Sequence, residues 1–158
     1  MSRVHASAVV LRETGVLIRG ASGSGKTSLA LALIDKTLMK QEFAALVGDD
    51  WVALTPFSGR LIASGASQTA GIAERRGLGL VRVPTLAAGV VSLVVDLAAT
   101  SHPPQRMPEA MTTLVRVEGV AVERLSLTHR SSVEFNASIV VEALVNMGTI
   151  GAARVDFP

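Results

Sequence analysis

The chain has 158 residues, 49% of them hydrophobic and 18% charged, which predicts one compact globular domain with a sizeable core and excludes a disordered tail. Fifteen basic against thirteen acidic side chains leave a formal charge of +2, the arginines are scattered without interleaved aromatic residues, and tyrosine is absent, so binding to nucleic acid or to an anionic membrane is disfavoured. The absence of cysteine excludes disulfides, zinc ribbons and thiol catalysis.

The first third of the chain predicts a hairpin followed by a helix. Apolar runs at 6–11 and 15–18 are separated by the polar residues 12–14, which is typical of two strands joined by a tight turn. A helix is predicted from Thr27 to about Met39, with basic residues near its carboxyl end, where they favour the helix dipole.

Further strands are predicted along the middle of the chain. A short apolar strand at 44–48 ends in two aspartates, and strands at 51–54 and 60–63 flank a turn at 56–59. The segment 90–97 has the composition of the most deeply buried strand in the chain.

The last third predicts a loop and a final helix. Three prolines between 101 and 108 indicate the loop, and a helix is expected at 137–146 with Asn136 as its cap. Because many of the strands are joined by tight turns, we predict a mixed, partly antiparallel sheet with few helices.

The cellular location is predicted from the absence of a signal peptide and of a membrane-spanning segment in the sequence. The amino terminus lacks the pattern of a signal peptide, since Arg12 and Glu13 interrupt its apolar run. The longest apolar stretch, 86–99, is broken by Ser92 and Asp96 and is too short to span a membrane. We therefore expect a soluble cytoplasmic protein.

The segment 20–27 is a complete phosphate-binding motif of the form G-x-x-x-x-G-K-[ST] between a predicted strand and a predicted helix. Its glycines allow backbone N–H groups to turn onto phosphate oxygens, and the helix start adds the positive end of its dipole. Lys26 is expected at the β- and γ-phosphates and the Thr27 hydroxyl at Mg²⁺. A Gly-rich turn of no function is the alternative, which the flanking elements disfavour. The predicted nucleotide-binding residues are Gly20, Ala21, Ser22, Gly23, Ser24, Gly25, Lys26 and Thr27.

Carboxylates at strand ends are candidates for the metal and for proton transfer. Asp49 and Asp50 close the strand after the helix, and such a pair is able to divide the work, one acid facing the metal and the other accepting a proton. A solvated Asp-Asp turn is the alternative. Asp96 also ends an apolar run, but we interpret it as a charge at a strand terminus.

The segment 73–80 combines an acid, two arginines and two glycines beside an apolar run. Glu74 and Arg76 on a tight glycine turn have the chemistry to complete a clamp on metal and phosphate, and an ordinary charged turn is the alternative. His5 precedes the first long strand, close to the phosphate-binding loop if the hairpin forms.

Together these segments resemble the catalytic domain of the HPr kinase/phosphorylase family, in a short form without the family's N-terminal domain. The shared features are His5, the phosphate-binding loop, the segment 47–52 with its two aspartates, and the segment 74–79 with its Arg-Gly-Leu-Gly core. The last is much more specific than the loop. The resemblance covers roughly residues 5–145.

This resemblance implies an ATP- and Mg²⁺-dependent protein-serine kinase that phosphorylates HPr, the phosphocarrier of the sugar phosphotransferase system. It implies a P-loop fold related to phosphoenolpyruvate carboxykinase, and a homo-oligomer, commonly a hexamer. By position, Asp50 matches the proton acceptor with Asp49 beside it, Glu74 a Mg²⁺ ligand, His5 an active-site histidine, and Arg106 a catalytic arginine.

The chain departs from the family pattern in two places. The helix after the loop is longer than usual, and the family's Pro-x-x-Gly-Arg-Asn type motif, associated with dephosphorylation, retains only Asn136. Two alternatives to the protein kinase remain: a small-metabolite kinase, although no compact arginine lid is evident, and a non-catalytic nucleotide-sensing module.

Overall fold

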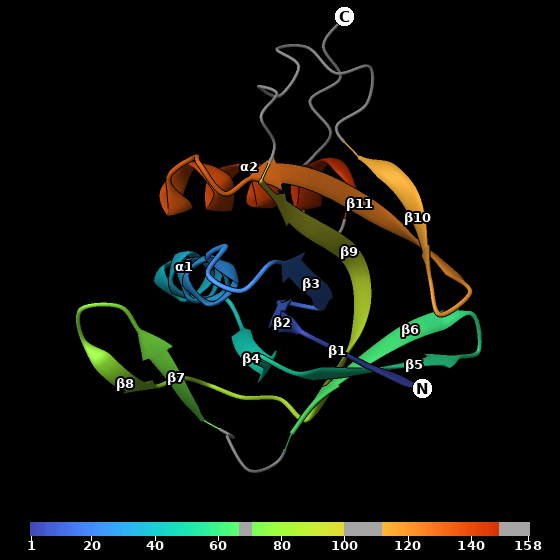
Figure 1. The fold of residues 1–158 in the computed structure, drawn as a ribbon, viewed down its shortest axis with the longest axis horizontal. Helices are drawn as coiled ribbons and strands as arrows, with labels where there is room; N and C mark the ends of the chain where they lie inside the picture. Colours follow the sequence, from blue (N-terminus) through green and yellow to red (C-terminus); the bar gives the residue numbers. More distant parts are fainter. Residues whose placement is uncertain (67–70, 100–111, 149–158) are drawn as a thin grey trace, which may run out of the picture.

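The computed structural model describes residues 1–66, 71–99 and 112–148. These residues form a nine-stranded mixed sheet, a separate two-stranded hairpin and two helices (Figure 1). The prediction of a mixed sheet with few helices is confirmed. In chain order the elements are β1 Ser2–Val4, β2 Ala6–Leu11, β3 Thr14–Gly20, α1 Lys26–Met39, β4 Ala44–Gly48, β5 Val52–Phe57, β6 Arg60–Gly65, β7 Ile72–Arg75, β8 Gly79–Arg82, β9 Ala88–Ala98, β10 Thr113–Val117, β11 Val120–Thr128 and α2 Val133–Asn146.

The strand directions bring three sequence-distant ends to one edge of the sheet. The strands are ordered β1-β5-β6-β9-β3-β2-β4, and β11 also pairs with β9. β2 is antiparallel to both β3 and β4, so β3 and β4 run in the same direction. Consequently the residues that follow β3, the residues that follow β4 and the start of β2 all lie at the same edge.

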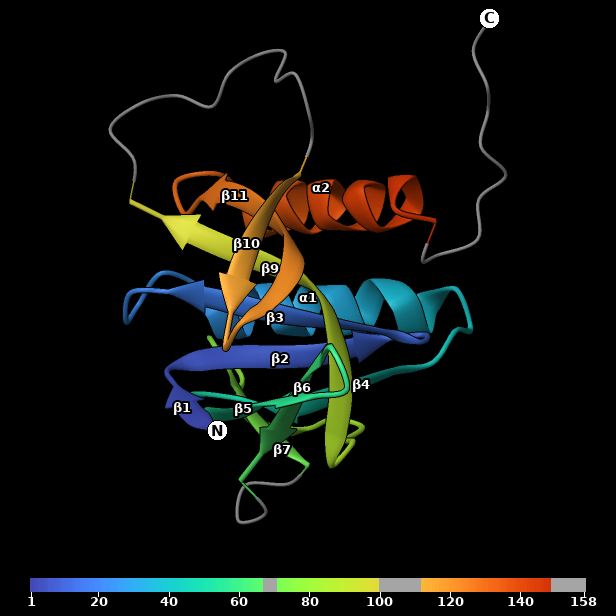
Figure 2. The same ribbon diagram turned by 90° about the vertical axis from the view of Figure 1, so that its right-hand side faces the viewer.

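The core consists of two apolar clusters on opposite faces of the sheet. One face packs against α1 and α2, which lie side by side along it (Figure 2). The other face buries side chains that come from strands alone, because the sheet bends along β9 toward β5 and β6. Alternate residues of β2 and β3 therefore face different clusters, which explains why both strands are apolar throughout.

Two boundary predictions are wrong. The turn between β5 and β6 is Ser58-Gly59 and not 56–59, because both residues adopt positive φ and form a tight two-residue connection. Pro56 continues β5 beyond the part paired with β1, where its missing N–H breaks no ladder bond.

The second wrong prediction is the cap of the last helix. α2 begins at Val133, and Ser132 caps it by accepting a hydrogen bond from the Phe135 N–H. Asn136 lies buried in the first turn of α2, and its side-chain amide donates to the Thr128 carbonyl at 3.0 Å. It anchors α2 to the end of β11.

A bridge of two arginines and one carboxylate fastens β3 and β11 to β9. Asp96 accepts bonds from Arg19 at 2.7 and 2.8 Å and from Arg124 at 2.6 Å. Burial raises the pKa of Asp96, but the hydrogen bonds and charges of the two arginines outweigh burial and hold the pKa below its ordinary value. The earlier interpretation as a charge at a strand end is incomplete, since Asp96 lies inside β9 and joins three strands.

Replacing Asp96 with asparagine is expected to lower the free energy of unfolding at pH 7 by about 2 kcal/mol, because two guanidinium groups lose a charged acceptor. The folded-state pKa lies below the unfolded-state value, so the wild-type contribution is complete above about pH 4 and is lost as the pH falls further. Urea unfolding between pH 7 and pH 3 measures both effects. A variant with wild-type stability, or with the same acid-induced loss as wild type, contradicts this prediction.

Candidate functional site

The segment between β3 and α1 has the geometry of a phosphate-binding loop. Gly23 and Gly25 have φ values of 77° and 96°, a region that L side chains rarely adopt, and Gly25 is the N-cap of α1. A Cβ atom at Gly20 would lie 2.4 Å from Ser24 Oγ and 3.0 Å from the Leu97 carbonyl oxygen, so the loop start also needs glycine. The backbone thus turns onto the start of α1, where unpaired N–H groups and the helix dipole favour the binding of an anion.

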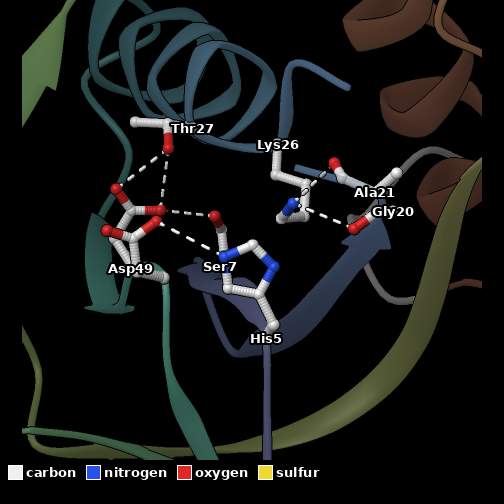
Figure 3. A network of polar contacts seen from close by, with 8 residues as sticks. His5, Ser7, Gly20, Ala21, Lys26, Thr27 and Asp49 are labelled. Carbon is white, nitrogen blue, oxygen red and sulfur yellow. Dashed lines mark hydrogen bonds and ion pairs between the residues drawn. The ribbon is translucent and has the colours of Figure 1, made fainter. Parts of the chain in front are cut away.

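The Lys26 ammonium lies inside the loop. Its side chain is 6% exposed, and Nζ donates to the carbonyls of Gly20 and Ala21 at 2.9 Å each (Figure 3). These bonds account for two of the three protons of the ammonium, which leaves donor capacity for an anion. Ser24 Oγ is buried in the same loop without a hydrogen-bond partner in the described residues, so a further polar group there is favourable.

Asp49 is bound to the first turn of α1. The Thr27 hydroxyl lies 2.9 Å from both carboxylate oxygens of Asp49, and the Ser7 hydroxyl of β2 donates to Oδ1 (Figure 3). Two hydroxyl groups from different elements therefore hold one carboxylate beside the phosphate-binding loop.

Asp50 has a different environment from Asp49. Its side chain is 78% exposed, and its Oδ1 lies 3.8 Å from His5 Nε2. The backbone of Asp50 is left-handed, with φ 64°, and its carbonyl accepts the Ala6 N–H. The ring of Trp51 meets the His5 ring edge-on, with centroids 5.6 Å apart. This arrangement leaves the Asp50 carboxylate free of hydroxyl donors among the described residues.

The β7–β8 hairpin contributes the predicted acid and arginine. Glu74 is in β7 and Arg76 in the turn, and both line the same pocket as the phosphate-binding loop. Arg75, between them, forms an ion pair with Asp35 of α1 at 3.0 Å, which links the hairpin to the helix.

A pocket of about 830 Å³ joins these groups. Residues from six separate segments of the chain line it. Gly20 and Ala21 do not line it and instead offer their carbonyls to Lys26. Arg106 lies outside the described residues. The predicted site residues in the lining are His5, Ser22, Gly23, Gly25, Lys26, Thr27, Asp49, Asp50, Glu74 and Arg76.

Comparison with protein families gives a match over almost the whole chain. The model of the HPr Serine kinase C-terminal domain matches residues 1–152. The chain belongs to this family.

Individual relatives agree with that assignment. The chain is 40% identical over 85 residues to the HPr kinase/phosphorylase of Clostridium tetani and 39% identical to that of Clostridium beijerinckii. Each match covers 54% of this chain and 26% of the relative, so the chain corresponds to a minor part of those proteins. The solved structure of the Hpr(Ser) kinase/phosphatase from Coxiella burnetii superposes with a TM-score of 0.71 at 25% identity, covering 93% of this chain and 99% of that one.

The family implies ATP and, as in kinases generally, Mg²⁺, and the residues present fit the metal. Mg²⁺ at a nucleotide usually keeps several waters and takes one or two protein oxygens in addition to phosphate oxygens. The pair of Thr27 and Asp49 supplies such oxygens. Across the described residues, no three acidic or histidine side chains are gathered closely enough to form a metal cage. Glu74 and Asp49 both line the pocket.

Two features were missed by sequence analysis. Ser7 bonds to Asp49 although its only sequence signal is a polar residue in an apolar strand. The Arg19–Asp96–Arg124 bridge has no sequence signal, because its members are far apart in the chain. Neither helix in the described part of the chain has the length and apolarity to cross a membrane.

Proposed function

We propose that the chain is a catalytic domain of an ATP-dependent protein-serine kinase that phosphorylates HPr. The observation that carries the proposal is the shared pocket: most of the phosphate-binding loop, the Asp49-Asp50 pair, Glu74 and Arg76 line one cavity. Membership of the family and the names of the relatives support HPr as the acceptor.

The proposed roles follow from the two environments of the acids. Lys26 and the loop amides bind the β- and γ-phosphates, and Thr27 with Asp49 holds Mg²⁺, with Glu74 facing the same space. Mg²⁺ neutralises developing charge on the phosphate oxygens. Asp50, which has no hydroxyl donor among the described residues, accepts the proton of the serine hydroxyl as that oxygen bonds to the γ-phosphorus and ADP leaves. Arg76 contributes positive charge, as does Arg106 by resemblance.

Further parts of the proposal rest on family resemblance. We propose a cytoplasmic location and a homo-oligomer, commonly a hexamer in this family. Native mass spectrometry of the purified chain tests the oligomer, with a single species of monomer mass contradicting it.

Transfer of label from [γ-³²P]ATP to purified HPr tests the function. Labelled HPr is expected only with Mg²⁺ present and only when HPr retains its acceptor serine. Absence of transfer by the wild-type chain, or equal labelling of HPr with alanine at that serine, contradicts the proposal.

The two alternatives give different results in the same assay series. A small-metabolite kinase hydrolyses ATP faster in the presence of its metabolite, whereas the protein kinase responds only to a protein acceptor. A nucleotide-sensing module binds ATP tightly without turnover toward either.

Reverse phosphorylase activity is not part of the main proposal. The only retained residue of the dephosphorylation motif is Asn136, which is buried in α2 and bonded to the Thr128 carbonyl, away from the residues that line the pocket. Incubation of labelled HPr with inorganic phosphate tests this reaction, and we expect little release of label from the protein.

A further inference from the structure

Ser7 is a buried hydroxyl in a strand that is otherwise apolar. Its side chain is 1% exposed, and the other residues of β2 are alanine, valine and leucine. A buried hydroxyl destabilises a fold unless it finds a hydrogen-bond partner. The partner of Ser7 is the Asp49 carboxylate, which belongs to the site and not to the core.

The direction of the Ser7 side chain follows from strand alternation. Ala6, Ala8 and Val10 face the cluster made by strands alone, so Ser7 faces the opposite side together with Val9 and Leu11. That side carries α1, whose first turn holds Thr27. The pairing of Ala8 with Gly48 then sets Ser7 beside the residue that follows β4, which is Asp49.

The two hydroxyl groups that contact Asp49 differ in whether they are expected to bind a metal. Thr27 is the loop residue whose oxygen is expected to bind Mg²⁺, and it can do so only if its proton is directed elsewhere. Asp49 accepts the hydrogen bond that this proton makes, since both carboxylate oxygens lie 2.9 Å from Thr27 Oγ1. Ser7 contacts Asp49 from the strand side and is not among the residues lining the pocket.

We infer that Ser7 is a positioning residue for magnesium. Its hydroxyl holds the Asp49 carboxylate in the orientation that accepts a hydrogen bond from the Thr27 hydroxyl. The lone pairs of the Thr27 oxygen are thereby left for the metal. The Ala6 N–H bond to the Asp50 carbonyl, at 3.2 Å, fixes the same turn from the neighbouring residue. The inference rests on the part of the proposed function that concerns Mg²⁺ and ATP.

A magnesium titration with a non-hydrolysable ATP analogue tests the inference without any turnover. Trp51 is the single tryptophan of the chain and lies two residues from Asp49, so its fluorescence reports on this turn. With Ser7→Ala, the Mg²⁺ concentration at half-saturation is expected to rise at least about tenfold, as for other residues that orient a metal ligand. Binding of the analogue in EDTA is expected to change less than about twofold, because Ser7 is absent from the pocket lining.

A matched control separates positioning from general destabilisation. Thr14 in β3 is also a buried hydroxyl residue, 3% exposed, at the opposite end of the β2–β3 hairpin. Thr14→Val is expected to leave both titrations unchanged. Ser7→Cys, which keeps a donor at the same position but is slightly larger and donates more weakly, is expected to fall between wild type and Ser7→Ala, and it decides the question if Ser7→Ala does not fold.

Two results overturn the inference: an unchanged magnesium requirement in the Ser7 variant, or equal weakening of analogue binding with and without magnesium. Failure of the proposed function gives a different pattern. If the wild-type chain binds the magnesium–analogue complex but does not label HPr, the HPr kinase assignment is wrong. The effect of Ser7→Ala on the magnesium requirement is still expected in that case.

Discussion

Lys26→Met is expected to lower kcat/KM for phosphoryl transfer to HPr by about a thousandfold. The ammonium is the buried cation of the loop, held there by two carbonyls, and methionine keeps most of its volume without its charge. The variant then lacks the positive charge that we propose to stabilise the transferring phosphoryl group. Steady-state labelling of HPr with varied ATP measures the loss.

Lys36→Met is the matched control for that variant. Lys36 is in the last turn of α1 and does not line the site pocket. We expect it to retain wild-type transfer, and we expect both variants to keep a cooperative thermal unfolding transition. A rate of transfer by Lys26→Met within a few-fold of wild type would show that Lys26 has no catalytic role.

Asp50→Asn is expected to reduce kcat for transfer by about a thousandfold, within the range found for loss of a general base. The amide has nearly the same shape but accepts no proton from serine. Asparagine also tolerates the left-handed backbone of this position, so the fold is expected to remain intact. Binding of the magnesium–analogue complex, followed by Trp51 fluorescence, is expected to change little, which separates chemistry from binding.

Glu118→Gln serves as the control for Asp50→Asn. Glu118 is likewise an acid with positive φ, 49°, but it lies in the turn between β10 and β11, away from the site pocket. Its neutralisation is expected to have no effect on transfer. Full activity in Asp50→Asn excludes Asp50 as the proton acceptor and indicates that the serine proton leaves by another route.

The different surroundings of Asp49 and Asp50 give a physical basis for a division of work between them. Asp49 accepts hydrogen bonds from two hydroxyl groups, which fix the orientation of its carboxylate beside Thr27. Asp50 is mostly exposed and its neighbour is the His5 ring at 3.8 Å. These surroundings favour the proposal that Asp50, whose carboxylate is not held by hydroxyl donors among the described residues, is the acid that accepts the proton.

Local chemistry in the sequence was sufficient to predict much of the fold and to single out residues that the structure places around one pocket. The β2–β3 hairpin, α1 and β4 follow from apolar runs bounded by turn residues, and the loop 20–27 follows from its motif. The cap of α2 was placed wrongly because Ser132 and Asn136 are both good capping residues, and only the backbone shows which one precedes the first helical turn.

Tertiary structure alone decided how the site residues meet. Nothing local in the sequence states that β4 runs beside β2, yet this pairing sets Asp49 next to Ser7 and the phosphate-binding loop. The same holds for Glu74 and Arg76, which reach the pocket because β7 packs against α1. Motifs depend on neighbouring residues and are readable in one dimension, whereas strand order depends on how all the apolar faces are buried at once, and that is settled only when the chain folds.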